Sequence, residues 1–488
     1  MAHRNKHPHI IVIMADQLRW DALGEHTPVI NRLVEESTLF DRAYCASPIC
    51  GPARGAFFTG CYPNRTGSII NPWEPLDSRH GDVRAGTPNL YTIFEPEWDS
   101  HHVGKQHLFT EEKIDRQADA KTDWNSLERG YKAFLKRQGV RAPGGDRFKG
   151  IVPEMVGGRV TRARKYSVPA VGLYEPGFDT FYDGYIANTA LEAIRGRDPD
   201  RPLMLNAMFV APHPPYDIPD PWYSMIDDVD LPESVGRWYD DQSPLQLYNL
   251  PGAIGVRYTR DEWRGVWRVY LGLVALLDHA VGMIIDELKA QSIYDDSLIV
   301  FCSDHGEMLG SHMLYQKMCM YEPSVRTPIA LKLPVGTGIK PGVVDEVVSS
   351  IDVLPTICEL VGTEPPAGID GRSLVPIMAS GAPGRDAAFI QFDGNGARGN
   401  FQRAVIQAEH KLIVDLFKDE TYLELYDVVN DPEETTNLAF DPDQRERLER
   451  MALLLSAHMA DTGDLLSMEP GVVATFLADY APVRASRR

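Results

Sequence analysis

The sequence predicts an α/β fold, in which helices flank a large mixed, mostly parallel sheet and a smaller C-terminal α+β domain with an antiparallel sheet follows. Two observations predict the large domain, over residues 1–380: apolar runs of strand length that end abruptly in polar residues, and a long amphipathic helix between them. A third observation predicts the small domain, over 381–488. Four alternating segments follow a stretch rich in Gly and Pro at 381–385.

Two of the apolar runs end in residues that can bind a metal. His9–Ala15 stops at Asp16 and Gln17, and Ser297–Ser303 stops at Asp304–His305. The carboxyl ends of parallel strands meet at one edge of a sheet, where ligands bind. Two carboxylates, one amide oxygen and one imidazole suit a single hard divalent cation, with Ca²⁺, Mn²⁺ and Mg²⁺ as candidates. Taken singly, these residues also fit a helix cap and a surface loop.

Further elements follow from periodicity along the large domain. Asn31–Phe40 predicts a helix with one apolar face, and Pro52–Thr59 predicts a helix whose N-terminus favours an anion. Leu203–Val210 has the composition of a buried strand, and Trp263–Leu288 has the period of a long amphipathic helix. Residues 110–180 are polar and Gly-rich, which predicts a variable, loop-rich insertion near the ligand site.

The C-terminal part predicts a small sheet with a helix packed on it. A helix is expected from about Gln444 to Asp461. The tail from Gly471 onward is too apolar for a free linker, so we expect it to close over the site or to meet another subunit. The alternating segments that predict the antiparallel strands are Ala387–Phe392, Gln402–Gln407, Lys411–Asp415 and Thr421–Tyr426.

Composition limits the possible partners. The chain has 488 residues, 43% of them hydrophobic, and a formal net charge of −20 with no basic block to offset it. This charge argues against nucleic acid and against an anionic membrane surface as partners. The first apolar run is too short for a signal sequence, and we expect no membrane-spanning stretch, which together favour a cytoplasmic protein. The six cysteines show no paired spacing typical of a disulfide framework.

A short run around Cys50 carries the most specific signal. Cys50-Gly-Pro-Ala53-Arg54, followed by Thr59-Gly60, is a Cys-x-Pro-x-Arg pattern that resembles the maturation signature of the type I sulfatases, in the alkaline phosphatase superfamily. In that family an oxidising enzyme converts the cysteine to formylglycine, and the hydrated aldehyde is the nucleophile. Ala53 departs from the Ser of many relatives, which puts the efficiency of conversion in question. Alone, the run also fits a small buried cysteine near a proline turn.

Three other segments resemble elements of the same family and occur in the family's order. They are His102-Val-Gly-Lys105-Gln-His107-Leu, Phe209-Val-Ala-Pro-His213-Pro-Pro, and Gln316-Lys317-Met-Cys-Met-Tyr321-Glu322 with Arg326-Thr-Pro328. Toward the end of the chain, an Asp-Pro-x-Glu…Asn-Leu pattern within 427–438 matches a further family element. The resemblance therefore extends over most of the chain and implies the alkaline phosphatase-like fold.

The resemblance implies roles for individual residues. Lys105 would neutralise the ester, His107 would position the nucleophile, His213 would contact the bound sulfate or the leaving group, and Lys317 would stabilise the departing alkoxide. Asn71 and His312 are weaker candidates for lining the pocket. The implied catalytic residues are Cys50, Arg54, Lys105, His107, His213 and Lys317, and the implied metal ligands are Asp16, Gln17, Cys50, Asp304 and His305. Singly, a loop histidine or a solvated lysine explains His213 or Lys317 equally well.

The implied function is hydrolysis of sulfate monoesters through a formylglycine gem-diol and a covalent sulfo-enzyme intermediate. The alternative is a phosphonate monoester or phosphodiester hydrolase with the same nucleophile and metal site. Lys105 and His107 favour sulfate, because the phosphonate hydrolases carry Tyr and Thr there. A phosphomonoesterase or phosphotransferase would use Ser or Thr and a second metal, which Cys50, Lys105 and Lys317 oppose. A non-catalytic anion-binding protein requires that Cys50 stay a thiol.

The implied partners are a small anionic ester as substrate and a formylglycine-generating enzyme for maturation of Cys50. The cofactors are one divalent metal ion and the modified cysteine itself. A homo-oligomer is also possible.

Overall fold

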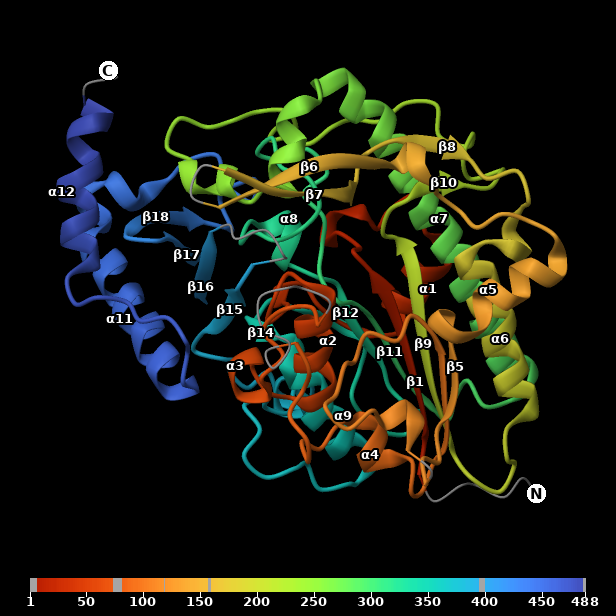
Figure 1. Ribbon diagram of the computed structural model, residues 1–488. Helices are drawn as coiled ribbons and strands as arrows, with labels where there is room; N and C mark the ends of the chain where they lie inside the picture. The colour runs from red at the N-terminus through yellow and green to blue at the C-terminus, as the bar shows by residue number, and fades with distance from the viewer. Residues whose placement is uncertain (1–6, 73–80, 118, 157–158, 395–399, 486–488) are drawn as a thin grey trace.

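The computed structural model describes residues 7–72, 81–117, 119–156, 159–394 and 400–485 (Figure 1). A large sheet runs through the middle of the molecule, and every pairing in it is parallel except the two made by β12. The predicted α/β fold with a mixed, mostly parallel sheet is therefore confirmed. The strands in spatial order are β13 (Gly342–Val344), β2 (Thr38–Phe40), β12 (Ile329–Lys332), β11 (Ser297–Ser303), β1 (His9–Asp16), β9 (Leu203–Pro212), β4 (Asp99–Gly104) and β5 (Asp123–Ser126).

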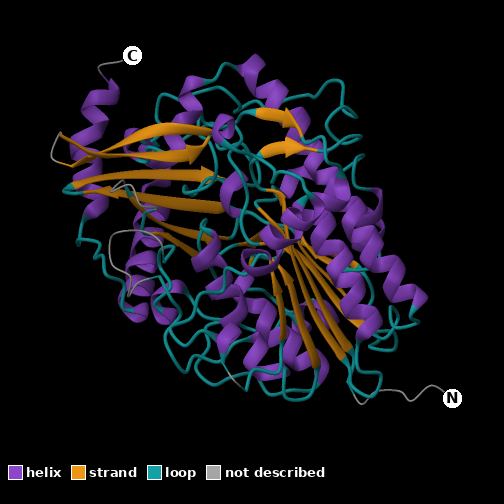
Figure 2. Cartoon of the chain, turned by 45° about the vertical axis from the view of Figure 1, so that its right-hand side comes forward, coloured by secondary structure: helices purple, strands orange, loops and turns teal. Residues whose placement is uncertain are grey.

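Helices cover both faces of this sheet, as Figure 2 shows. Side chains of the central strand β1 alternate between two hydrophobic layers, since successive residues of a strand point to opposite faces. Ile11, Ile13 and Ala15 belong to one layer and Ile10, Val12 and Met14 to the other. The first layer contains α1 (Pro28–Glu35), α6 (Tyr182–Gly196) and α7 (Arg260–Ala290); the second contains α2 (Cys50–Thr59), α4 (Leu90–Phe94), α9 (Val353–Val361) and α10 (Val375–Ser380).

Helix α7 corrects the expectation that no stretch is long enough for a membrane span. Its 31 residues include an 18-residue window of mean hydropathy 1.7, which suffices by length and composition alone. However, 72% of that window is buried in the protein, against the sheet and α6. The helix begins with a capping box between Thr259 and Glu262, and its apolar side chains belong to the core.

The C-terminal sheet is antiparallel, as predicted, in the order β15 (Ala388–Phe392), β16 (Phe401–Gln407), β17 (His410–Phe417) and β18 (Glu420–Asp427). One face packs on the large domain and the other on α11 (Arg445–Thr462) and α12 (Val472–Ala485). The described part of the tail, residues 471–485, does not close over the site. Val473 and Phe476 of α12 pack beside Tyr422 of β18, at the edge of the molecule (Figure 1), because this apolar face covers the outer side of the sheet.

Two predicted elements were wrong. Asn31–Phe40 is not one helix: α1 ends at Glu35, and residues 38–40 form β2, because pairing with β12 and β13 outweighs the helical period of so short a segment. Residues 110–180 are not loop-rich either. They contain β5, α5 (Leu127–Gln138), β8 (Val171–Leu173) and a hairpin of β6 (Lys149–Val156) and β7 (Arg159–Ser167), which crosses the upper side of the molecule in Figure 1.

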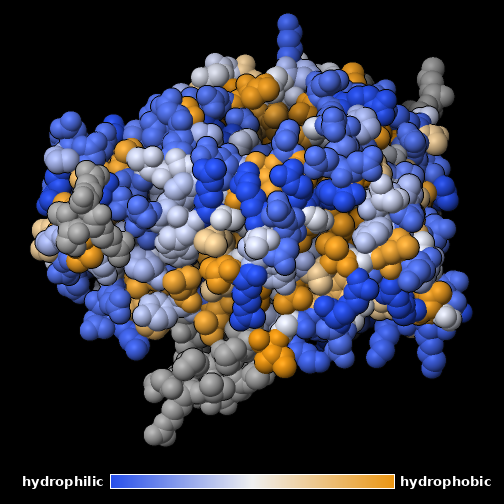
Figure 3. All heavy atoms as spheres, turned by 90° about the horizontal axis from the view of Figure 1, so that it is seen from above, coloured by the Kyte–Doolittle hydropathy of each residue, from blue (hydrophilic) through white to orange (hydrophobic). Residues whose placement is uncertain are grey.

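Short elements complete the architecture. β8 pairs with β10 (Tyr216–Ile218), and β3 (Ala43–Tyr44) pairs with β14 (Val348–Ser349). The remaining short helices are α3 (Pro63–Thr66) and α8 (Glu322–Val325). The predicted boundary at 381–385 lies between α10 and β15. Figure 3 shows the molecule from above, where hydrophilic side chains predominate and small apolar groups lie between them.

Candidate active site

Side chains from distant segments meet at one edge of the large sheet. Asp16 is the last residue of β1, Asp304 and His305 follow β11, Lys105 follows β4, and His213 follows β9. These four strands are parallel neighbours in the order β11-β1-β9-β4, so their carboxyl ends meet, as the sequence predicted.

Three of these residues form a compact, buried cluster with Cys50, the first residue of α2. The possible ligand atoms of Asp16, Cys50, Asp304 and His305 all lie within 4.8 Å of one another. The Sγ of Cys50 is 3.1 Å from His305 Nε2 and 3.8 Å from Asp16 Oδ1. Nδ1 of His305 lies 3.0 Å from the carbonyl oxygen of Gly306, which fixes the tautomer with hydrogen on Nδ1 and directs the Nε2 lone pair into the cluster. Two carboxylates and a lone pair so oriented fit a divalent cation.

Two cations hold the carboxylates together. Arg54 donates from Nε to Asp304 Oδ2 at 2.9 Å and from Nη2 to Asp16 Oδ2 at 3.3 Å, and its third nitrogen donates to the carbonyl oxygen of Lys105 at 3.2 Å. Lys105 itself contacts Asp16 Oδ2, and its Nζ is 3.6 Å from Cys50 Sγ. Arg54 is fully buried under the cluster, so it neutralises the two carboxylates and Lys105 supplies charge beside the cysteine.

The charges shift the pKa values of these groups. Burial alone would raise the pKa of Asp16, but Lys105 and Arg54 hold it well below its ordinary value. Burial and Asp16 raise the pKa of the Cys50 thiol, whereas Lys105, Lys317 and His305 lower it by more, so it lies below its ordinary value. Burial lowers the pKa of Lys105, and Asp16 with Cys50 raises it above its ordinary value. The cluster therefore favours an anionic group at position 50.

A cavity of about 660 Å³ opens above Cys50. Lys105, His107, His213 and Lys317 line it, so the structure brings the predicted catalytic side chains together around the cysteine. Burial first, and then nearby lysines, hold the pKa of His107 and of His213 well below the ordinary value, so both rings are neutral. The cavity exceeds two other hollows in the described part of the chain, which have about 150 and 210 Å³.

Asn71 and His312, the two weaker candidates, have different places. Asn71 lines the cavity, and its Oδ1 accepts the backbone N–H of Gly51 at 3.1 Å, in the first turn of α2. His312 lies outside the cavity lining. Its ring stacks on Tyr321 at 4.0 Å and its Nε2 lies 3.0 Å from the carbonyl oxygen of Glu433, so it packs against the C-terminal part and has no place in the substrate pocket.

Several cavity residues carry no motif and were missed. Leu127, Glu128 and Tyr131 come from α5, Tyr166 comes from the end of β7, and Tyr182 begins α6. Glu128 Oε1 lies 3.7 Å from His107 Nε2. The amphipathic period of 127–138 is the signal that could have indicated α5, since Tyr131 and Leu135 lie one turn apart on its buried side.

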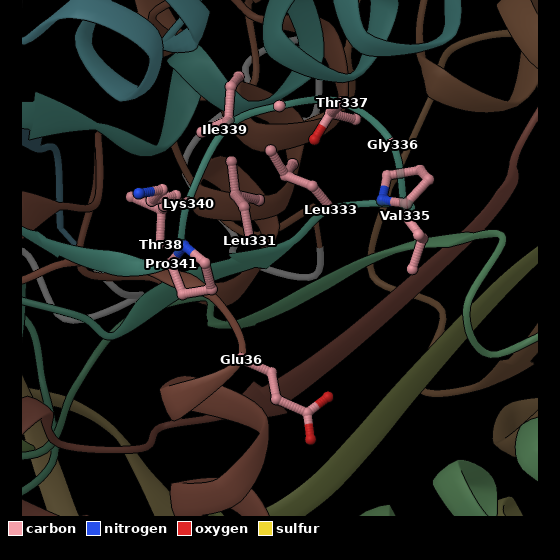
Figure 4. Close-up of a pocket in the computed structure, with 12 residues that line it drawn as sticks. Glu36, Thr38, Leu331, Leu333, Val335, Gly336, Thr337, Ile339, Lys340 and Pro341 are labelled. Carbon is pink, nitrogen blue, oxygen red and sulfur yellow. The ribbon is translucent and has the colours of Figure 1, made fainter.

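Smaller hollows elsewhere lack such a constellation. Figure 4 shows one of about 150 Å³, between Glu36, Thr38 and the loop at 333–341. Its charged side chains are Glu36 and Lys340, and no described cysteine or histidine lines it. A second, of about 210 Å³, lies between α1 and α7.

Comparison with known families gives two matches. The profile of the Sulfatase family matches residues 8–363, which include all the cluster and cavity residues described above. The profile "N-sulphoglucosamine sulphohydrolase, C-terminal" matches residues 310–461.

Individual proteins are similar over most of their length. A choline-sulfatase of Rhizobium meliloti is 29% identical over 459 residues, covering 89% of this chain and 83% of that protein. The multifunctional alkaline phosphatase superfamily protein PehA of Trinickia caryophylli is 28% identical, with 89% and 91% covered. Among solved structures, the phosphonate monoester hydrolase of Agrobacterium radiobacter has a TM-score of 0.74 at 22% identity, covering 95% of this chain and all of that one, which establishes a common fold.

Proposed function

The chain belongs to the sulfatase family, and from this premise we propose that it is a sulfuric ester hydrolase that cleaves sulfate monoesters with a formylglycine made from Cys50. One observation carries the proposal. The only side chain of the described cluster that also lines the large cavity is Cys50, which stands at the first position of α2 beside Lys105. A nucleophile derived from it would face an ester bound in that cavity.

The position suits an anionic group. Cys50, Gly51 and Ala53 lie in the first turn of α2, whose N-terminus carries a partial positive charge. Lys105 and Lys317 line the same cavity, so the ester oxygens would meet fixed cations in a partly dry pocket. Formylglycine at position 50 would require a formylglycine-generating enzyme as partner.

The hydrated aldehyde at position 50 would carry two hydroxyl groups. One hydroxyl loses its proton to water, favoured by the charge of Lys105, and its oxygen attacks the ester sulfur. The bond between sulfur and the alcohol oxygen breaks, its electron pair stays on that oxygen, and Lys317 supplies the proton that the alkoxide takes up. The second hydroxyl gives its proton to the neutral His107, the aldehyde C=O re-forms, and the bond from carbon to the sulfate oxygen breaks.

Asp16, Gln17, Asp304 and His305 would hold one divalent ion, Ca²⁺, Mn²⁺ or Mg²⁺, which when bound polarises an ester oxygen. The protein's own contribution is to keep two carboxylates in contact with Arg54, whose charge offsets theirs in a buried site.

The second candidate is hydrolysis of phosphonate monoesters or phosphodiesters by the same nucleophile. The name of the Agrobacterium radiobacter structure, a phosphonate monoester hydrolase, makes this reaction worth testing. Lys105 and His107 in the cavity lining support sulfate as the preferred ester, as the motif comparison suggested. The two transition states differ mainly in charge, so some activity on both esters is expected.

The test is kcat/KM for one aryl alcohol presented as a sulfate monoester, a phosphonate monoester and a phosphodiester. We expect the sulfate to be turned over best and all three activities to vanish in Cys50→Ala. Mass spectrometry of the peptide with residue 50 should show the aldehyde in active preparations. Preferred turnover of the phosphonate or the diester would establish the second candidate, and full activity with an unmodified thiol would rule out the formylglycine.

A further inference from the structure

Glu307 is a buried carboxylate next to the site that the mechanism above leaves without a role. It follows the Asp304-His305-Gly306 segment after β11 and is fully buried. Its Oε1 accepts the backbone N–H of Leu309 at 2.9 Å, and its Oε2 accepts the side-chain amide nitrogen of Gln17. No cationic side chain forms an ion pair with Glu307 in the described part of the chain.

The partners of the Gln17 amide leave it one orientation. Nε2 donates to Glu307, and Oε1 accepts from Lys317 Nζ at 2.6 Å. An ammonium only donates hydrogen bonds, so the atom that faces Lys317 must be the amide oxygen, and the NH₂ group is left to face Glu307. If the amide flipped, its oxygen would face the Glu307 carboxylate and its NH₂ group would face Lys317, so both bonds would be lost.

The backbone of Gln17 is fixed independently of this amide. Its φ of 70° is left-handed, and its N–H donates to Asp304 Oδ1 at 3.1 Å. Its carbonyl oxygen accepts the hydroxyl of Tyr270 at 2.9 Å. With the main chain held in this way, rotation of the terminal amide decides whether its oxygen or its NH₂ group faces Lys317.

We propose that Glu307 is a positioning residue that orients the Gln17 amide, so that its oxygen serves the cation site and anchors Lys317. An amide oxygen is a ligand for a hard cation, whereas an NH₂ group in the same place repels it. Outer partners of ligands commonly change metal affinity by about tenfold to a hundredfold. This proposal rests on the proposed function for the purpose of the cation, but its test is binding and needs no turnover.

The experiment is titration of the metal-depleted protein with Mn²⁺, followed by calorimetry, for the wild type and variants. We expect Glu307→Ala to weaken Mn²⁺ binding about tenfold or more, and Glu307→Gln to weaken it less, because one acceptor oxygen remains. Glu434→Gln, which removes another fully buried carboxylate far from the cluster, is the matched control and should bind Mn²⁺ as the wild type does.

An exchange of the two side chains separates orientation from simple packing. Gln17→Glu places two carboxylates against each other and should weaken binding, whereas Gln17→Glu with Glu307→Gln restores one amide-to-carboxylate bond and should recover much of the affinity. Circular dichroism without metal verifies that each variant is folded. If folded Glu307→Ala and Glu307→Gln bind Mn²⁺ as tightly as the wild type, or if the exchange does not recover affinity, the proposal is wrong. Absence of sulfatase turnover in the wild type, with the expected Mn²⁺ affinities of all variants, would count against the proposed function and not against this role of Glu307.

Discussion

Two clusters of buried charge lie at opposite ends of the segment from Lys317 to Glu322. The first is the catalytic floor, in which Asp16 and Asp304 contact Arg54 and Lys105. The second, which we call the junction cluster, consists of Glu322, Lys411, Glu424 and Glu434 and lies where the C-terminal sheet meets the large domain. All of these side chains are buried, yet the two clusters have opposite electrostatic character.

The two clusters differ in the number of cationic side chains that contact their carboxylates. In the floor, Lys105 and Arg54 outweigh burial and hold the pKa of Asp16 well below its ordinary value. In the junction cluster, Lys411 is shared between Glu322 and Glu434, at 2.8 and 2.7 Å, and burial raises the pKa of Glu434 despite it. At equal burial, the pKa of Asp16 is thus lowered, whereas the pKa values of Glu424 and Glu434 are raised.

The surroundings explain why each arrangement is useful. The floor opens onto the cavity of about 660 Å³, where fixed cations can attract an anionic ester. The junction cluster is sealed, and its hydrogen bonds run between elements: Tyr321 donates to Glu424 at 2.7 Å, and the N–H of Glu322 donates to Glu434 at 2.6 Å. Under the proposed function, the first cluster binds the ester and takes part in its cleavage, whereas the second joins two parts of the fold.

The largest expected effect is on stability, from Lys411→Met. Removing this ammonium leaves Glu322 and Glu434 buried without their shared cation, which should lower the free energy of unfolding by about 3–5 kcal/mol. Urea denaturation measures the loss, and Lys418→Met, at an exposed position after β17, is the control with no large effect. The folded fraction should keep its kcat/KM for aryl sulfate; a stable variant with lost activity would contradict the division between the clusters.

The next effect is on catalysis, from Lys317→Ala. Loss of this cation from the cavity should lower kcat/KM for sulfate esters on the order of a hundredfold. The free energy of unfolding should change little, in contrast to Lys411→Met. Lys165 also lines the cavity but pairs with Asp146 at 2.9 Å, so Lys165→Ala serves as the matched lysine control with a small effect. Unchanged kinetics in Lys317→Ala would remove this residue from the catalytic set.

The same contrast explains what the sequence could and could not predict. The residues of the catalytic floor could be predicted, because Asp16 and Asp304 come at the ends of apolar strands and Cys50 lies in a specific short motif. The C-terminal strands were predictable from alternation as well. Residues 38–40 were not, because their strand depends on partners about 290 residues away along the chain. The tyrosines of the cavity wall follow no motif, since only tertiary packing of α5, β7 and α6 brings them together.

A pH profile of stability sharpens the comparison further. Burial raises the pKa of Glu424 from 4.5 to about 7, and Asp415 adds to this, while hydrogen bonds from Tyr321 and Tyr426 offset only part. The folded state thus binds the proton more tightly than the unfolded chain, so this group lowers stability progressively as pH rises from about 4.5 to about 7.

Glu424→Gln removes that ionisation. The wild type should lose about 2 kcal/mol more than the variant between pH 5 and pH 7.5, measured by urea denaturation at each pH. The difference should vanish below pH 4, where both states of the wild type are protonated. Parallel profiles for the two proteins would show that Glu424 does not titrate on unfolding.

The smallest expected effect is on kcat/KM, from substitution of Asp183. This residue lies near Asp16, yet burial raises its pKa, as it does for Glu424 and Glu434 of the junction cluster. Burial raises its pKa to about 7, and its Oδ1 accepts the N–H groups of Val210 and Ala211 at 2.8 and 3.0 Å, where β9 departs from regular pairing. His213 follows directly, and its N–H donates to the carbonyl of Val210 at 2.8 Å.

A single oxygen of Asp183 accepts both backbone hydrogen bonds, and an asparagine has such an oxygen too. Asp183→Asn should therefore keep kcat/KM, whereas Asp183→Ala should lower it about tenfold. If Asp183→Ala acts by displacing His213, the fall in kcat/KM should be larger for sulfates of poor leaving groups than for aryl sulfates. The falls in Asp183→Ala and His213→Ala should then not be additive in the double variant. Equal losses for all leaving groups would place Asp183 with the purely structural carboxylates of the junction.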